Sequence, residues 1–284
     1  MLPTPTLRTK TAAGRRLNTP SASATQGKMT MALWKYTDEY LDAINRWDGI
    51  MSAPSKENRK RPEGIQIVAN PVLERFFGTS PWWGPAIWFF PLIGYCLHRS
   101  INDPTLNAGL IAGLMGGGVI AWTLLEYILH RWIFHANPGD SVAHKRRLFM
   151  MHGYHHEFPS DRRRLVAPPA LSWPLAAIIV PAFYFLFGPH NAFPVIAGTV
   201  VGYLAYDWVH YYTHHARPRT RMGKYLRRFH LEHHFKDQDT HYGLSSPLWD
   251  LILATYTRPS EQPTQDELDC LSRTAAPGST DAAA

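Results

Sequence analysis

The sequence predicts an all-α integral membrane protein with four transmembrane helices, arranged as two hairpins, and a helical cap on one side of the membrane. Two observations predict this fold class. The 284 residues contain three blocks without Asp, Glu, Lys or Arg, and the last block is long enough for two spans. Ten histidines lie in four short clusters, and two of these clusters follow each predicted hairpin.

The N-terminal part of the chain differs in composition from the rest. Residues 1–28 are rich in Ser, Thr and Ala and carry basic residues without any acid. We therefore expect a disordered basic leader or a transit-like segment, with Met29 or Met31 as alternative start sites. Residues 29–75 are predicted to form a membrane-surface segment, because residues 34–47 mix aromatic and charged side chains. A plain amphipathic linker is the alternative.

The predicted spans lie in a membrane-embedded domain at residues 76–257. Residues 76–97 and 104–125 contain no charged side chain, and each stretch is long enough for one span, because a bilayer core needs about 20 mostly apolar residues as helix. Residues 165–206 are also free of charge and about twice as long. Gly, Pro, His and Asn at 188–191 favour a turn, so this block is predicted to form two spans.

Two hairpins return the chain to the same side of the membrane, so all four histidine clusters should lie on one face. Basic residues surround the second and fourth clusters, whereas the turn at 98–103 has only Arg99 against Asp103 and the turn at 188–191 has no Lys or Arg. Cytoplasmic loops carry an excess of Lys and Arg, so the histidine face is predicted to be cytoplasmic. The basic residues are Lys145, Arg146, Arg147, Arg162, Arg163, Arg164, Arg217, Arg219, Arg221, Lys224, Arg227, Arg228 and Lys236.

Charge and cysteine content argue against other classes of protein. Five positive charges of the formal net charge of +7 lie in residues 1–28, so the pI of 9.4 does not indicate a nucleic-acid groove. Cys96 and Cys270 lie far apart, which argues against a disulfide framework and a cysteine-based zinc site. Residues 258–284 are rich in Pro, Ser and Ala and are predicted to form a disordered tail.

The clustered histidines predict a metal site. Neutral imidazole is a common ligand of zinc, iron and copper, and ten imidazoles are too many for one ion of about four to six ligands, so two metal ions are predicted. The HxxHH and HxxxH spacings place imidazoles on one helical face, whereas His130 and His135 lie about 140° apart and should point to different metals or straddle a helix end. The predicted ligands are His130, His135, His152, His155, His156, His210, His214, His230, His233 and His234. The predicted fold therefore includes a cytosolic helical cap that holds a histidine-rich dinuclear metal site.

The other five histidines do not fit the clusters. His215 is a candidate extra ligand, but as the neighbour of a matched pair it is expected to lie behind the ligands. His98, His144, His190 and His241 are expected at the surface or at interfaces. A histidine-rich four-span protein could also be a metal transporter, but transporters place their ligands near the bilayer midplane, whereas these clusters follow the spans. The zinc-peptidase signature HExxH is absent from the sequence.

Longer strings around the histidines resemble those of one family. The strings are EYILHRWIFH at 126–135, MHGYHHEFPSDRRRLVAPP at 151–169, GYLAYDWVHYYTHHARP at 202–218 and YLRRFHLEHHFKDQDTHYGLSSPLWD at 225–250. They resemble the fatty acid (dihydroceramide) 2-hydroxylases of the fatty acid hydroxylase/sterol desaturase superfamily. The resemblance implies O2-dependent hydroxylation at C-2 of a long acyl chain, either a free fatty acid or the N-acyl chain of a sphingolipid such as ceramide. A sterol or carotenoid hydroxylase or desaturase shares the histidine boxes and is the alternative.

The resemblance also implies roles for individual residues. It assigns the ten clustered histidines as ligands and places Tyr203, Tyr206 and Asp207 near the lipid head group, with Tyr206 and Asp207 as the catalytic candidates. Iron and zinc both stay open as the bound metal, but zinc has no redox chemistry, so iron is expected in the working enzyme. Glu126 and Asp207 share helical faces with ligands and could accept the second imidazole N–H; a capped or solvated helix end is the alternative.

The predicted reaction needs two electrons per turnover from another protein. Many relatives carry a cytochrome b5 domain with an HPGG haem motif, and no HPGG occurs in this sequence. A separate cytochrome b5 or ferredoxin-type donor with its reductase is therefore implied, and the basic rim would suit an acidic carrier. The expected location is a multi-pass position in the endoplasmic reticulum membrane or in a bacterial inner membrane.

Overall fold

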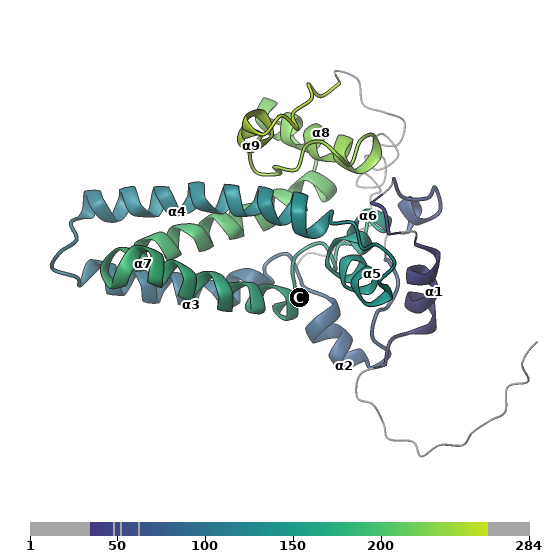
Figure 1. Ribbon diagram of the computed structural model, residues 1–284, viewed down its shortest axis with the longest axis horizontal. Helices are drawn as coiled ribbons and strands as arrows, with labels where there is room; N and C mark the ends of the chain where they lie inside the picture. Colours follow the sequence, from purple (N-terminus) through teal and green to yellow (C-terminus); the bar gives the residue numbers. More distant parts are fainter. Residues whose placement is uncertain (1–34, 48, 52, 62, 261–284) are drawn as a thin grey trace, which may run out of the picture. The chain divides into compact units, whose positions relative to one another are not determined.

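The chain folds into helices and loops, as Figure 1 shows for the computed structural model. Across the described residues, strand-like pairing is limited to one isolated bridge between Tyr36 and Val68. The all-helical prediction is therefore confirmed. The predicted leader and most of the predicted tail lie outside the described residues. The structure describes residues 35–47, 49–51, 53–61 and 63–260.

The helices fall into a set of long rods and a set of shorter helices. The rods are α3 (Gly84–Ile101), α4 (Ala108–Ile128) and α7 (Pro169–His215). The shorter helices are α1 (Asp38–Arg46), η1 (Asn58–Lys60), α2 (Pro71–Leu73), η2 (Glu74–Gly78), η3 (Leu129–Phe134), α5 (Val142–Leu148), η4 (Phe149–Gly153), α6 (Tyr154–Glu157), α8 (Arg221–Phe235) and α9 (Leu248–Ile252). Among them, η2, η3 and η4 are π-helical.

Gly188 divides α7 into two rods. Its φ of 76° lies in the region that favours glycine, and the break coincides with the turn predicted at 188–191. The halves, 169–187 and 189–215, run side by side with α3 and α4 (Figure 1). His190 Nδ1 lies 2.6 Å from Asp103 Oδ2, so the turn at Gly188 and the turn between α3 and α4 lie at the same end of the rods.

Glycines bring α4 and the second half of α7 into backbone contact. A Cβ on Gly118 would lie 2.2 Å from the carbonyl oxygen of Val195, and a Cβ on Gly198 would lie 2.0 Å from that of Met115. Small residues of this kind let helices approach closely where burial of apolar surface from water cannot drive association. The contact fixes the depth at which α7 carries its histidines relative to α4.

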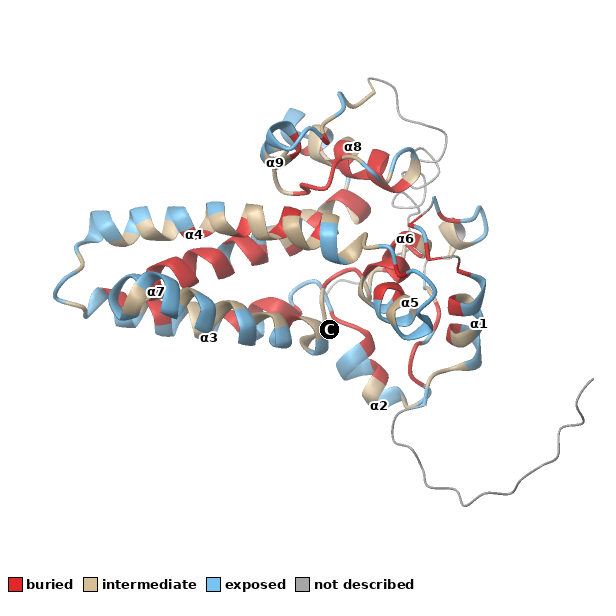
Figure 2. Cartoon of the chain, viewed as in Figure 1, coloured by how far each residue is buried: buried red, intermediate tan, exposed pale blue. Residues whose placement is uncertain are grey.

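The rods expose many of their residues, as Figure 2 shows, and many of these exposed side chains are large and apolar. Ile178 is 68% exposed and Phe185 is 84% exposed. Two helices, Ala108–Phe134 and Pro169–His215, are long and apolar enough to cross a membrane, and only 11% and 6% of their most apolar windows are buried. A core helix of a soluble protein would bury this surface, so lipid is the expected neighbour. The count of four spans stays a prediction.

A cap of shorter helices covers the other end of the rods; we define the cap as residues 129–165 and 216–257. The N-terminal segment, residues 35–78, packs against its first part, where Tyr40 and Ile44 share a buried core with Leu148 and Phe149. The placement of this segment at a membrane surface stays a prediction.

A buried polar network fastens the N-terminal segment to the cap. The Tyr154 hydroxyl donates to Asp161 Oδ2 at 2.9 Å and accepts from the Ile65 N–H at 2.8 Å. Arg164 pairs with Asp161 at 2.6 Å and also with Glu74. Because paired buried charges are costly to separate, this network holds the two segments together.

Candidate metal centre and adjoining cavity

The structure brings all ten clustered histidines together in two groups of five. In each group the nearest side-chain nitrogens all lie within 4.8 Å of one another, and each group could hold a metal ion. We call them the first and second histidine groups. The first group contains His130, His135, His152, His156 and His233; the second contains His155, His210, His214, His230 and His234.

The Nε2 atoms of each group face one another. His152 Nε2 lies 3.0 Å from the Nε2 atoms of His130 and His156, and His230 Nε2 lies 2.8 Å from that of His214. Two nitrogens bound to one cation at about 2.0–2.1 Å lie about 2.9–3.4 Å apart. A single proton cannot satisfy several converging nitrogens, so the arrangement fits a cation at the centre of each group.

A π-helical turn places His130 and His135 in the same group. The His135 N–H donates to the His130 carbonyl oxygen at 3.1 Å, which is the i→i+5 pattern of a π-helix. This wide turn brings residues five apart to one side, and the two ring centroids lie 5.0 Å apart. His135 caps the end of η3, so the pair straddles a helix end, the second of the two arrangements that the spacing allowed.

Each HxxHH cluster is shared between the two groups. His152 and His156 join the first group and His155 the second, whereas His230 and His234 join the second and His233 the first. Residues four apart lie on one helical face, and the residue between them is rotated toward the neighbouring group. The pairing ties the groups into one centre, in which the rings of His156 and His234 stack at a centroid distance of 4.2 Å.

Burial keeps the cap histidines neutral. Desolvation lowers the pKa of His135 to about 2 and the pKa of His155 to about 3. The same effect, with repulsion from neighbouring imidazoles, holds the pKa of His152, His156 and His233 well below the ordinary value. Neutral imidazole is the form that binds a metal, so the site is ready for cations near pH 7.

Backbone carbonyls orient two histidines of the first group. His130 Nδ1 donates to the Tyr242 carbonyl oxygen at 2.6 Å, and His233 Nδ1 donates to the Thr240 carbonyl oxygen at 2.7 Å. Donation from Nδ1 leaves the Nε2 lone pair for a metal. These carbonyl groups could not be predicted from the sequence, because a backbone acceptor has no side-chain signature. The only signal was the string HYGLSSPLWD at 241–250, directly after the fourth cluster.

Glu126 does not accept the second N–H of His130, contrary to the sequence-based expectation. The Tyr242 carbonyl already holds that N–H, and Glu126 instead accepts from the backbone N–H groups of Leu244 and Ser245. Asp207 likewise makes no hydrogen bond to His210 within the described part of the chain. Its Oδ2 atom is buried and unpartnered there.

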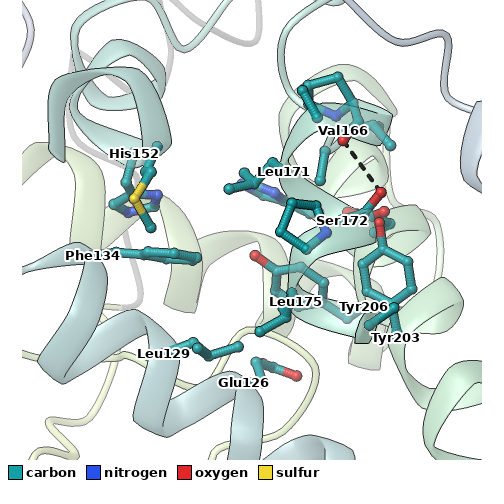
Figure 3. A pocket seen from close by; sticks show the side chains of 18 of the residues that line it. Glu126, Leu129, Phe134, His152, Val166, Leu171, Ser172, Leu175, Tyr203 and Tyr206 are labelled. Atoms are coloured by element: carbon teal, nitrogen blue, oxygen red, sulfur yellow. Dashed lines mark hydrogen bonds between the residues drawn. The ribbon is translucent and has the colours of Figure 1, made fainter. Parts of the chain in front are cut away.

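An apolar cavity of about 480 Å³ adjoins the histidines. Its long walls come from both halves of α7, from α4 and from the loop at 165–168. His152, His155 and His210 lie at one part of the wall. Figure 3 shows Tyr203, Tyr206 and Ser172 among the side chains that line it, together with Leu171, Leu175 and Phe134.

The predicted head-group residues lie on this cavity wall. Tyr203, Tyr206 and Asp207 all line the cavity. The Tyr203 hydroxyl and Asp207 Oδ2 are buried and have no hydrogen-bond partner among the described residues. Buried polar atoms are normally paired, so an incoming polar group is the expected partner.

The remaining histidines lie outside both groups. His215 packs against Tyr211 with tilted rings at a centroid distance of 4.9 Å and is not a member of either group. His190 pairs with Asp103 at the far turn. His241, expected at a surface or interface, is in fact buried, and it stacks on Phe229 at 4.0 Å. The short loop after α8 folds back under the helix, which covers this ring.

Arg227 also differs from its expected place on the basic rim. The side chain is 4% exposed and donates to the carbonyl oxygen of Ala216. It follows Gly223 by one helical turn on the buried face of α8, so it fastens the helix rather than facing solvent. The neighbouring Arg219, Arg221 and Lys224 are exposed.

Comparisons with known proteins agree with this site. Residues 115–255 match the family model described as fatty acid hydroxylase. A dihydroceramide fatty acyl 2-hydroxylase of Arabidopsis thaliana is 38% identical over 184 residues, which cover 63% of this chain and 75% of the relative. A ceramide very long chain fatty acid hydroxylase of Saccharomyces cerevisiae is 35% identical, and the match covers 78% of this chain and 54% of that protein. The solved structure of full-length scs7p, with only the hydroxylase domain visible, superposes with a TM-score of 0.65 at 28% identity, covering 81% of this chain and 83% of that one.

Proposed function

The chain belongs to the fatty acid hydroxylase family, and we propose that it is a membrane-bound fatty acid 2-hydroxylase, an oxidoreductase that places a hydroxyl group on C-2 of a long-chain acyl group. The relatives are named hydroxylases of fatty acids, of ceramide or of dihydroceramide. The proposed substrate is accordingly a free fatty acid or the N-acyl chain of a sphingolipid. The observation that carries the proposal is the apolar cavity, because its wall includes histidines of both groups.

The proposed substrate fits the chemistry of the cavity wall. The acyl chain would lie along the aliphatic residues of α7, such as Leu171, Leu175 and Ile179. The carboxyl or amide group next to C-2 would meet the unpartnered atoms of Tyr203 and Asp207. A polar anchor beside the histidines would place C-2 near them and the chain end away from them, which is the selection that a 2-hydroxylase needs.

We propose that the ten histidines of the two groups bind two iron ions, with zinc as a metal that the same nitrogens can hold. Bound iron would supply, with O2 and two electrons, the oxidising power that breaks an unactivated C–H bond; zinc has no redox chemistry. The histidines would hold the ions, and the apolar wall would exclude bulk water from them. Tyr206, whose ring lies 5.8 Å from that of His210, and Asp207 are the proposed catalytic residues on the substrate side.

The proposed topology has four membrane spans: α3, α4 and the two halves of α7. The metal centre would lie on the cytoplasmic face of the endoplasmic reticulum membrane or of a bacterial inner membrane. Exposed basic residues of the cap, among them Arg146, Arg147 and Arg163, support this orientation. The two turns at the other end of the rods, between α3 and α4 and at Gly188, carry little positive charge, and His190 pairs with Asp103 there.

The two electrons would come from a separate cytochrome b5 or ferredoxin-type protein with its reductase. An acidic carrier would find exposed positive charge at the start of α8, on Arg217, Arg219, Arg221 and Lys224. Such charges increase the rate of encounter more than the final affinity. The other functions considered, a sterol or carotenoid oxygenase and a metal transporter, are not favoured by the named relatives.

The test is purification without oxygen, followed by metal analysis and reconstitution with a b5-type donor, its reductase, O2 and an acyl substrate. The expected product carries a hydroxyl group at C-2, identified by mass spectrometry. His152→Ala should lower both bound metal and product, because His152 contributes to the first group and lines the cavity. His98→Ala is the control. Normal product formation by His152→Ala would contradict the assignment, and an oxidised sterol ring as the product would favour the alternative.

A further inference from the structure

The loop at residues 240–245 contacts the first histidine group in several ways. Its carbonyl oxygens at Thr240 and Tyr242 accept from His233 Nδ1 and His130 Nδ1. The Tyr242 ring also packs against the group, with centroids 5.6 Å from His130 and 5.4 Å from His135. The loop therefore sets both the direction and the packing of these imidazoles.

Two buried carboxylates hold this loop in place. Glu126, on α4, accepts from the Leu244 N–H, from the Ser245 N–H at 2.8 Å and from the Ser245 hydroxyl. Asp250, on α9, accepts from the Tyr242 N–H at 2.8 Å and from the Gly243 N–H at 2.8 Å. The two side chains are 3% and 0% exposed. No hydrogen bond joins either carboxylate to a histidine of the first group in the described part of the chain, so the loop is the main route by which both reach the imidazoles.

A chain of hydroxyl groups extends the Asp250 side of this arrangement. The Thr255 hydroxyl donates to Asp250 Oδ1 at 2.8 Å and lies 2.8 Å from the Tyr127 hydroxyl. Arg131 donates to the Tyr127 hydroxyl at 2.8 Å. Tyr127 lies just before the π-helical turn that carries His130, and Arg131 lies within that turn, so the hydroxyl chain links Asp250 to the turn.

The second histidine group has a different environment. The Nδ1 atoms of His214, His230 and His234 are buried and have no hydrogen-bond partner among the described residues. In the first group the same is true only of His156 Nδ1. A hydrogen-bonded Nδ1 fixes the ring orientation and raises the basicity of Nε2. The two groups are therefore built to hold a cation with unequal strength.

We propose that Glu126 and Asp250 are positioning residues for the first histidine group: they fix the 240–245 loop, whose carbonyls aim His130 and His233 at one of the two metal ions. The inference rests on the proposed two-metal centre and concerns which residues make its two halves unequal. Loss of either carboxylate should loosen one ion and leave the other in place.

The test measures release of Zn²⁺ from the zinc-loaded full chain to a chromogenic chelator. The wild type should release two ions in two phases. Asp250→Asn removes one acceptor oxygen and should accelerate release of one ion by about 10–100-fold, the usual effect of losing an outer partner of a ligand. Glu126→Ala should do the same, whereas Glu126→Gln, which keeps an oxygen for the loop N–H groups, should recover most of the wild-type rate. Glu74→Gln is the matched control, because Glu74 is also buried and accepts a backbone N–H, from Val68.

Two backgrounds identify the affected ion. His214→Ala removes a ligand of the second group, and in this background Asp250→Asn should accelerate release of the ion that remains in the first group. His135→Ala removes a ligand of the first group. In this background Asp250→Asn should not change the rate at which the ion of the second group is released. Equal acceleration in both backgrounds, or none in either, would overturn the positioning role alone. A wild-type chain that binds no Zn²⁺ would overturn the proposed metal centre itself, and this result is distinct from the former two.

Discussion

The rods and the cap distribute polarity in opposite ways. The rods expose apolar side chains such as Phe185, which is 84% exposed, whereas the cap buries polar ones such as His233 and Asp250, both 0% exposed. Either arrangement would be unfavourable for an isolated protein in water. The apolar surface of the rods suits a lipid environment, and the converging imidazoles of the cap suit cations. The stability of each region is therefore expected to depend on a different partner outside the chain.

Removal of the proposed metal ions should have the largest effect, and it should affect the cap and the rods differently. Structural Zn²⁺ contributes about 10–16 kcal/mol in small metal-dependent domains, so chelation should destabilise the cap far more than the rods. Hydrogen exchange in detergent should then accelerate at least about 100-fold in 129–158 and 221–245. Exchange in 84–101 and 108–125 should hardly change. Equal acceleration in rods and cap would show that the two regions are not separately stabilised.

A bulky side chain at the glycine contact should act on the rods instead. Gly198→Val would place a Cβ 2.0 Å from the Met115 carbonyl oxygen, and overpacking of this kind costs about 1–3 kcal/mol or more. The melting temperature in detergent should fall. The control is Gly116→Val on α4, where no heavy atom lies within 4 Å of the added Cβ. Equal melting temperatures for the two variants would contradict the close contact.

Asp207→Asn should lower the catalytic efficiency toward the substrate without changing the stability of the rods or of the cap. Asn would present an amide group where the carboxyl group presents an oxygen, and a buried polar atom left without its partner costs about 1–3 kcal/mol, so kcat/KM should fall about 10–100-fold. The metal content and the melting temperature should stay at the wild-type values. The paired variant Tyr203→Phe should lower kcat/KM in the same direction. Loss of metal from Asp207→Asn would instead assign the residue to the metal centre.

Charge reversal at and just before the start of α8 should have the smallest effect. Arg219→Glu with Arg221→Glu should slow turnover several-fold when the electron donor is limiting and at low salt, because steering acts mainly on association. Turnover with saturating donor should be close to normal. Arg146→Glu with Arg147→Glu, on α5, is the control. Equal slowing by both pairs would point to net charge rather than to a docking surface.

The histidine pattern predicted which residues gather, because helical spacing and the length of the apolar stretches can be read locally from the sequence. Ten histidines stand at helical spacing after apolar stretches, and the structure gathers all ten into two groups. The turn at Gly188 could also be predicted from the sequence, because glycine and proline favour a break in the helix there. These features depend on residues within a few positions of one another.

Other features depend on contacts between distant segments and could not be predicted. His130 and His135 share a group because η3 is π-helical, and the sequence does not distinguish such a turn from an α-helix. Glu126 reaches a loop 118 and 119 positions along the chain rather than the nearby His130. Arg227 looked like part of a basic rim, but the packing of α8 buries it.

The interleaving of the histidine groups has a consequence for biosynthesis. His135 and His233 lie in one group although they are 98 positions apart in the chain. When residue 156 leaves the ribosome, the first group already has four of its five histidines, whereas the second has only His155. The second group gains His210 and His214 after the long apolar hairpin of α7, and α8 completes both. In the proposed two-metal centre, loading of the first ion could thus begin during membrane insertion, and loading of the second would follow it.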